Sequence, residues 1–99
     1  MKAYRGDRTL DGLQVSVGDS VLDPRLDVKT ISENGFEWGY EGPEPTQLAL
    51  AILCDHFDDN EKAVQSCDAF MKAVVANFNN EWEMTTEDVD TALKNIGCA

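Results

Sequence analysis

The sequence predicts a small α+β domain, in which an antiparallel sheet packs against about three helices. Three observations favour this class. The first third of the chain contains short segments that alternate apolar and polar residues and end at turn dipeptides. After residue 42, long stretches carry apolar residues at helical spacing. A length of 99 residues, 42% of them hydrophobic and 27% charged, suits a single domain over residues 1–99 with one core.

Strands are expected first along the chain. Residues 2–5 are a brief strand candidate that ends at Gly6 and the turn after it. Residues 13–22 form two alternating segments on either side of Gly18-Asp19, which is typical of a hairpin with a two-residue loop. Pro24 ends the second strand of this hairpin, because proline cannot donate a hydrogen bond to a sheet.

A third strand is expected from the aromatic residues of segment 34–43. Phe36, Trp38 and Tyr40 alternate with polar or small residues, and glycines frame the segment as turns. We expect one or two of these aromatic side chains to face the core and the third to be exposed.

Two helices should follow the aromatic segment. The first, over residues 43–57, opens with two prolines, which a first turn tolerates. Its nearly continuous apolar run at 48–53 predicts a mostly buried central helix. The second should start at Asp58 or Asp59 and run to about Phe78, because its apolar residues recur at three- and four-residue steps.

The C-terminal part predicts one more strand and one more helix. Trp82 and Met84 alternate with two glutamates, as in a short strand. Thr85 with Asp88 three residues later is a variant of the capping box and should begin the last helix. Gly97 is expected to end that helix.

The cysteines and the N-terminal residues indicate a cytoplasmic protein. Cys54, Cys67 and Cys98 are odd in number and lack paired spacing, as expected of free thiols in a reducing compartment. The first residues are polar, with no apolar segment of a signal peptide behind them. The longest apolar run, residues 48–54, is far shorter than the roughly 20 residues that cross a bilayer.

The net charge of −11 is unevenly distributed along the chain. Residues 1–30 carry five basic and five acidic groups, whereas residues 31–99 carry three lysines and fourteen carboxylates. Direct binding to nucleic acid or to an anionic membrane would place anion against anion. We therefore expect neither as a direct partner.

Four short motifs occur in a distinctive order: Tyr4-Arg5-Gly6, LDPRLD at 22–27, GFEWGY at 35–40 and QLALAIL at 47–53. This order resembles a family of short uncharacterised proteins found in bacteria, phages and plasmids, and the resemblance spans nearly the whole chain. It implies a link to mobile genetic elements. It implies no activity, cofactor or catalytic residue, because none is established for the family.

Neither a catalytic site nor a metal site is expected. His56 lies two residues from Cys54, and side chains at that spacing on a helix point to different sides, so they cannot pair as base and nucleophile. A histidine at a helix C-terminus interacts favourably with the helix dipole. The cysteines lack zinc-ligand spacing, residues 55–61 lack the glycine and distal glutamate of a calcium loop, and no glycine-rich phosphate loop occurs. We expect a non-catalytic protein without a cofactor or metal.

Carboxylates are the candidate partner-binding groups. Part of the acidity has a simpler explanation, because carboxylates stabilise helix N-termini by about 0.3–1 kcal/mol each and an acidic surface aids solubility. Both explanations stay open for this surface. The candidates form three clusters: Glu33, Glu37, Glu41 and Glu44; Asp55, Asp58, Asp59 and Glu61; and Glu81, Glu83, Glu87, Asp88 and Asp90.

These observations support two hypotheses. The leading one is an interaction protein of a phage or other mobile element that binds a basic protein surface, such as a host nucleic-acid-binding protein or complex. Its sharpest form is a DNA mimic that inhibits a restriction nuclease or a CRISPR complex. The alternative is a host accessory domain that binds a small molecule or peptide through the aromatic loop of Phe36, Trp38 and Tyr40. The sequence predicts no particular oligomeric state.

Overall fold

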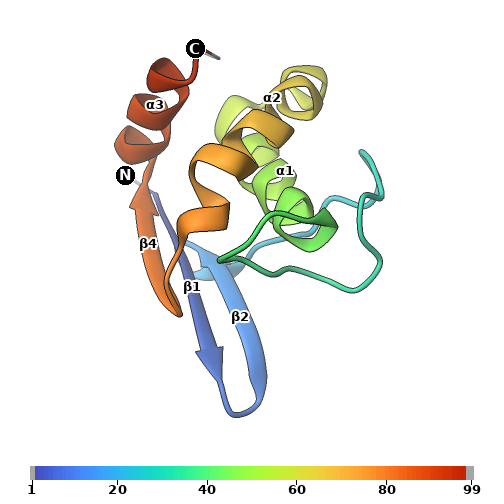
Figure 1. Ribbon diagram of the computed structural model, residues 1–99, viewed down its shortest axis with the longest axis vertical. Helices are drawn as coiled ribbons and strands as arrows, with labels where there is room; N and C mark the ends of the chain where they lie inside the picture. The colour runs from blue at the N-terminus through green and yellow to red at the C-terminus, as the bar shows by residue number, and fades with distance from the viewer. Residues whose placement is uncertain (1, 98–99) are drawn as a thin grey trace.

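Strand β1 (Ala3–Thr9) lies inside a four-stranded antiparallel sheet, and both of its edges are paired. The computed structural model describes residues 2–97. The strand order is β3-β2-β1-β4, formed with β2 (Gly12–Val17), β3 (Ser20–Val21) and β4 (Glu81–Thr85). Helices lie on one side of this sheet (Figure 1). The arrangement confirms the predicted α+β class.

The hairpin predicted around Gly18 is present. Val17 pairs with Ser20 across a two-residue loop, and Ser16 pairs with Val21. Gly18 has a φ of 57°, the left-handed conformation that tight hairpin loops require and glycine adopts readily. The predicted strand around Trp82 is also present as β4, which pairs with β1.

The prediction that the first strand ends at Gly6 is wrong, because β1 continues to Thr9. Gly6 lies directly opposite Trp82 of β4, and the indole ring occupies the space that a side chain at position 6 would fill. A Cβ placed on Gly6 would lie 2.2 Å from Trp82 Nε1. This glycine therefore provides room for a ring within the sheet and does not end a strand.

The predicted third strand over residues 34–43 does not form, since the segment is a loop. Gly35 and Gly39 have φ values of 88° and 87°, which are incompatible with an extended strand. The loop is fixed to the core at Trp38, which is fully buried, and by the Gly39 N–H, which donates to the Val75 carbonyl at 3.1 Å.

Helix α1 (Pro43–Phe57) matches the predicted span, and all its residues from Gln47 to Cys54 are buried. The Gln47 amide also organises the loop before the helix. Its Oε1 accepts the Ile31 and Ser32 N–H groups at 2.7 and 3.0 Å. Its Nε2 donates to the Pro24 carbonyl at 2.7 Å. A fully buried polar group is stable here because its hydrogen bonds are made.

Helix α2 (Asn60–Ala73) packs beside α1 and ends earlier than predicted. Val74 has non-helical angles, φ −123° and ψ −65°, and a single 3-10 turn, η1 (Val75–Asn77), follows it. The apolar stripe nevertheless continues beyond the helix, because Val75 is buried and the Phe78 ring stacks on Trp82.

Helix α3 (Thr86–Asn95) begins with the predicted capping box. The Thr85 side chain accepts the Asp88 N–H at 3.1 Å, and the Asp88 carboxylate accepts the Thr85 N–H at 3.0 Å. Gly97, after the helix, has a left-handed φ of 77°.

The core contains the residues that the apolar stripes predict, including Trp38 and Leu50, which are both fully buried. Cys54 and Cys67 are buried free thiols, as predicted. Cys98 lies outside the described residues. Among residues 2–97, no helix has both the length and the apolar character needed to cross a bilayer.

Candidate interaction surface

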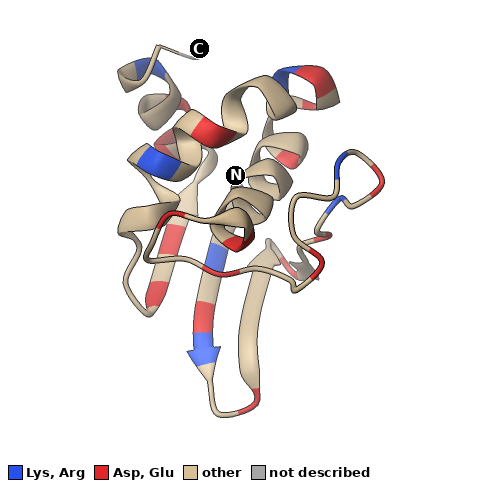
Figure 2. Cartoon of the chain, turned by 45° about the vertical axis from the view of Figure 1, so that its right-hand side comes forward, with Lys and Arg blue, Asp and Glu red and all other residues tan. Residues whose placement is uncertain are grey.

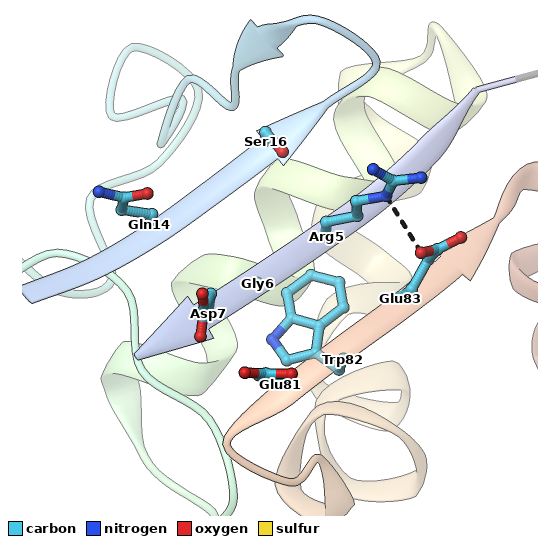
Figure 3. A pocket seen from close by; sticks show the side chains of 8 residues that line it. All are labelled: Arg5, Gly6, Asp7, Gln14, Ser16, Glu81, Trp82 and Glu83. Carbon is cyan, nitrogen blue, oxygen red and sulfur yellow. Dashed lines mark ion pairs between the residues drawn. The ribbon is translucent and has the colours of Figure 1, made fainter. Parts of the chain in front are cut away.

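The sheet face opposite the helices carries polar side chains from three strands. Strand alternation directs Tyr4, Val15 and Trp82 into the core, so their neighbours point outward. The pairing register then places Asp7 between Gln14 and Glu81, and Arg5 between Ser16 and Glu83. These side chains, with Gly6 and Trp82, line a shallow hollow of about 520 Å³ (Figure 3).

The charge on this face is unbalanced. Arg5 Nε lies 3.1 Å from a Glu83 carboxylate oxygen. Asp7 and Glu81 lie directly opposite each other, and no ion pair or hydrogen bond compensates either carboxylate within the described chain. Like charges at directly opposed strand positions are destabilising. The sequence contains one signal for this face, the period-two spacing of Arg5 with Asp7 and of Glu81 with Glu83. This spacing shows that each pair lies on one face of its strand, but only the strand register shows which residues lie opposite each other.

The cluster at the junction of α1 and α2 is partly structural. Asp55 accepts hydrogen bonds from the Tyr4 hydroxyl at 2.7 Å and from Lys2 Nζ at 3.2 Å. Burial and the Asp55 carboxylate together raise the pKa of Tyr4. Asp59 caps α2 by accepting the Lys62 N–H at 3.1 Å.

Two carboxylates of the same junction, Asp58 and Glu61, are exposed and have no side-chain partner within residues 2–97. Asp58 is the C-cap of α1 in the left-handed conformation, and Glu61 lies in the first turn of α2. The four predicted residues of this cluster are therefore neighbours. Two of them, Asp55 and Asp59, make hydrogen bonds that stabilise the fold.

The loop cluster divides in the same way. Glu37 forms an ion pair with Arg8 and accepts the Trp38 N–H at 3.0 Å. Burial alone would raise the pKa of Glu37, but these hydrogen bonds outweigh it and the pKa is lowered. Glu44 accepts the Tyr40 hydroxyl at 3.3 Å. Glu33 and Glu41 are exposed without such contacts in the described part of the chain.

On α3, two of three predicted acidic residues contact other groups. Asp88 belongs to the capping box. The Asp90 carboxylate lies 2.7 Å from His56 Nε2 and links α3 to the end of α1. His56 therefore has a specific partner that the sequence did not reveal, because the two residues are far apart in the chain. Glu87 has no side-chain partner between residues 2 and 97.

The predicted clusters do not merge into one acidic patch. Acidic positions occur on strands, loops and helices (Figure 2). Seven of the predicted carboxylates make hydrogen bonds or ion pairs: Glu37, Glu44, Asp55, Asp59, Glu83, Asp88 and Asp90. Six make none in the described chain: Glu33, Glu41, Asp58, Glu61, Glu81 and Glu87.

The three aromatic residues of the loop do not share a pocket. Trp38 is fully buried and Tyr40 is 43% exposed, so one faces the core and one faces solvent, as predicted. Phe36 is partly buried. It lines a groove of about 440 Å³ beside β2, together with apolar residues that sequence reasoning had not grouped with it: Leu13, Val15, Val21 and Leu22.

A comparison with known protein families matches most of the chain. The family described as a family of unknown function, DUF6166, matches residues 4–95. The chain belongs to the DUF6166 family. Comparison with curated proteins and with solved structures finds no significant match.

The chemistry available in this DUF6166 chain is limited by its packing. Burial raises the pKa of both described thiols, Cys54 and Cys67, so the reactive thiolate form is disfavoured. No group of three or more histidine, cysteine or acidic side chains within residues 2–97 is placed to hold a metal ion. The polar sheet face and the apolar groove are surface features that a partner could contact. A third hollow, of about 510 Å³, lies between β3 and α1, where Lys2 and Arg25 face Asp23 and Asp55.

Proposed function

We propose that this DUF6166 chain is a non-catalytic interaction domain that binds a basic protein surface. The observation that carries the proposal is the uncovered sheet face, where Asp7 and Glu81 are directly opposed and form no ion pair with any basic side chain of residues 2–97. Such a pair costs stability in the free domain. A lysine or arginine from a partner placed between the two carboxylates would remove that cost.

The remaining charge supports the same partner class. Five of the eight basic residues already form ion pairs within the chain: Lys2, Arg5, Arg8, Arg25 and Lys72. The negative charge of the carboxylates without a partner is therefore not neutralised within the described chain. Its electrostatic potential attracts a basic surface and speeds association. In the sharpest form of the proposal, the partner is a DNA-binding protein of a host defence system, and the chain is encoded by a phage or mobile element.

The test is capture of proteins from a bacterial lysate on the immobilised domain, followed by binding kinetics with the captured partner. Wild type is compared with the double variant Asp7→Asn/Glu81→Gln. The matched control is Asp58→Asn/Glu61→Gln, which changes the net charge equally at another exposed site. We expect binding to weaken steeply as salt shortens the screening length below about 10 Å, and the sheet-face variant to lose more affinity than the control.

Two results would contradict this proposal. If the affinity changes neither with salt concentration nor with the sheet-face substitutions, the acidic face is excluded as the interface. A larger loss in the control variant would move the interface to the junction of α1 and α2. For the sharper form, double-stranded DNA should compete with the domain for the captured protein, and failure to compete would reject DNA mimicry alone.

A further inference from the structure

The edge of β2 that faces β3 is only half covered. β3 has two residues and pairs only with Ser16 and Val17, whereas β2 starts at Gly12. The Leu22 N–H donates to the Val15 carbonyl at 3.1 Å. Because hydrogen bonding alternates along antiparallel strands, Leu13 presents its own N–H and carbonyl to the same edge. No strand within residues 2–97 pairs with it there.

The free edge borders the apolar groove. Leu13, Val15, Leu22 and Phe36 contribute its apolar lining, and Val21 is 86% exposed at its side. Natural proteins protect exposed edges with charges, prolines or bulges. None of the residues that line this groove is charged or a proline. An unpaired edge beside apolar pockets is the arrangement with which domains bind an extended peptide as an added strand.

The charges around the groove select the occupant. Residues 10–24, which hold β2, β3 and the turns beside them, contain Asp11, Asp19 and Asp23 but no lysine or arginine. The arginines that flank this segment, Arg8 and Arg25, are ion-paired with Glu37 and Asp27. All three carboxylates are exposed. A second copy of the chain on this edge would bring the same three charges against them. A basic segment would instead be attracted to them.

We propose that the groove binds an extended segment of the partner in which basic and apolar residues alternate. The segment lies beside β2 as an additional strand and pairs with the Leu13 backbone. Because strand side chains alternate between faces, its apolar side chains enter the groove and its basic side chains face outward toward the turn carboxylates. The basic character of the segment rests on the proposed function, whereas the site of docking does not.

The probe is a short synthetic peptide of alternating lysine and valine, titrated into the labelled domain and followed by amide NMR. We expect the largest shift changes at Leu13, Gln14 and Phe36. The same peptide with alternate backbone nitrogens methylated cannot donate the strand hydrogen bonds and should not bind. Val21→Lys should weaken binding roughly tenfold. Leu10→Lys should not, although it adds the same charge to a fully exposed residue (109% exposed) in the turn at the other end of β2.

Results that contradict docking in the groove differ from results that contradict a basic partner. Equal loss in Val21→Lys and Leu10→Lys, or shifts confined to Asp7 and Glu81, would overturn docking in the groove while leaving the basic partner intact. A peptide of alternating threonine and valine that binds in the groove as tightly would overturn the basic character of the segment. A dimer detected by sedimentation, and dissociated by Val21→Lys, would make a second copy the occupant and overturn the proposal.

Discussion

Replacing Gly6 with alanine tests the packing of the sheet most directly. The added Cβ would lie 2.2, 2.4 and 2.7 Å from the Trp82 atoms Nε1, Cε2 and Cζ2. Carbon contacts are optimal at about 3.5–4.0 Å, so the ring would have to move by more than about 1 Å. Phe78 stacks on that ring at 4.3 Å, and Trp38 contacts it at 5.8 Å between centroids. The ring therefore has little space to move into.

Overpacking a filled core costs about 1–3 kcal/mol. We expect Gly6→Ala to lie near the upper end of this range, which lowers the Tm of a domain of this size by roughly 10–20 °C. The sign of the change in unfolding free energy is informative. At unstrained positions a glycine-to-alanine change stabilises a protein by about 0.4–1 kcal/mol, so a loss of stability indicates a steric clash. Urea unfolding followed by tryptophan fluorescence gives the free energy of unfolding.

A double-mutant cycle locates the cause of the loss. Trp82→Phe removes Nε1 and the fused ring that the Cβ would meet. In this background, Gly6→Ala should cost at least about 1 kcal/mol less than in wild type. Ser16→Ala, on the outward face of the neighbouring strand, serves as the control for a generic change in β-sheet residues. A stabilised Gly6→Ala protein, or a cost that is the same in both backgrounds, would refute this account of the sheet.

Three further predictions concern the core, the thiols and pH. Leu50→Ala should cost roughly 2–5 kcal/mol in urea unfolding through the cavity it leaves, and a loss below about 0.5 kcal/mol would contradict the full burial of Leu50. Reductant should leave the Tm unchanged, because Cys54 and Cys67 are free; a marked fall would reveal a disulfide. The lowered Glu37 pKa means that Glu37 favours folding above its unfolded pKa and loses this contribution as pH falls through its folded pKa. Glu37→Gln should therefore show a smaller loss of stability than wild type as the pH is lowered from 7 to 3, and parallel pH profiles would contradict this.

Sequence patterns correctly predicted the elements that depend on interactions between residues close together in the chain. The loop at Gly18 and the capping box at Thr85 and Asp88 depend on residues within three positions of each other, and both are present. The role of Gly6 was missed because its cause is Trp82, which is far away in the sequence. The aromatic alternation was misread as a strand because it reflects one buried ring, Trp38, on a loop bent by glycines.

The candidate site was harder to predict than the fold for the same reason. Carboxylates that look equivalent in the sequence differ in whether a distant residue contacts them. Asp55 is held by Tyr4 and Lys2, whereas Asp58, three positions later, has no such contact in the described chain. The opposition of Asp7 and Glu81 and the short length of β3 depend on sheet register, which single-strand patterns do not determine.

The position of β1 has a consequence for how the chain is made. β1 pairs on one side with β2, which follows it at once, and on the other with β4, near the end of the chain. A ribosome adds about 5–20 residues per second, so β1 must wait several seconds for its second neighbour. A hairpin of β1 and β2 that formed in that interval would expose the second edge of β1, with no indole beside Gly6. Synthesis of Trp82 then supplies the strand that pairs with the free edge of β1 and the indole that lies against Gly6.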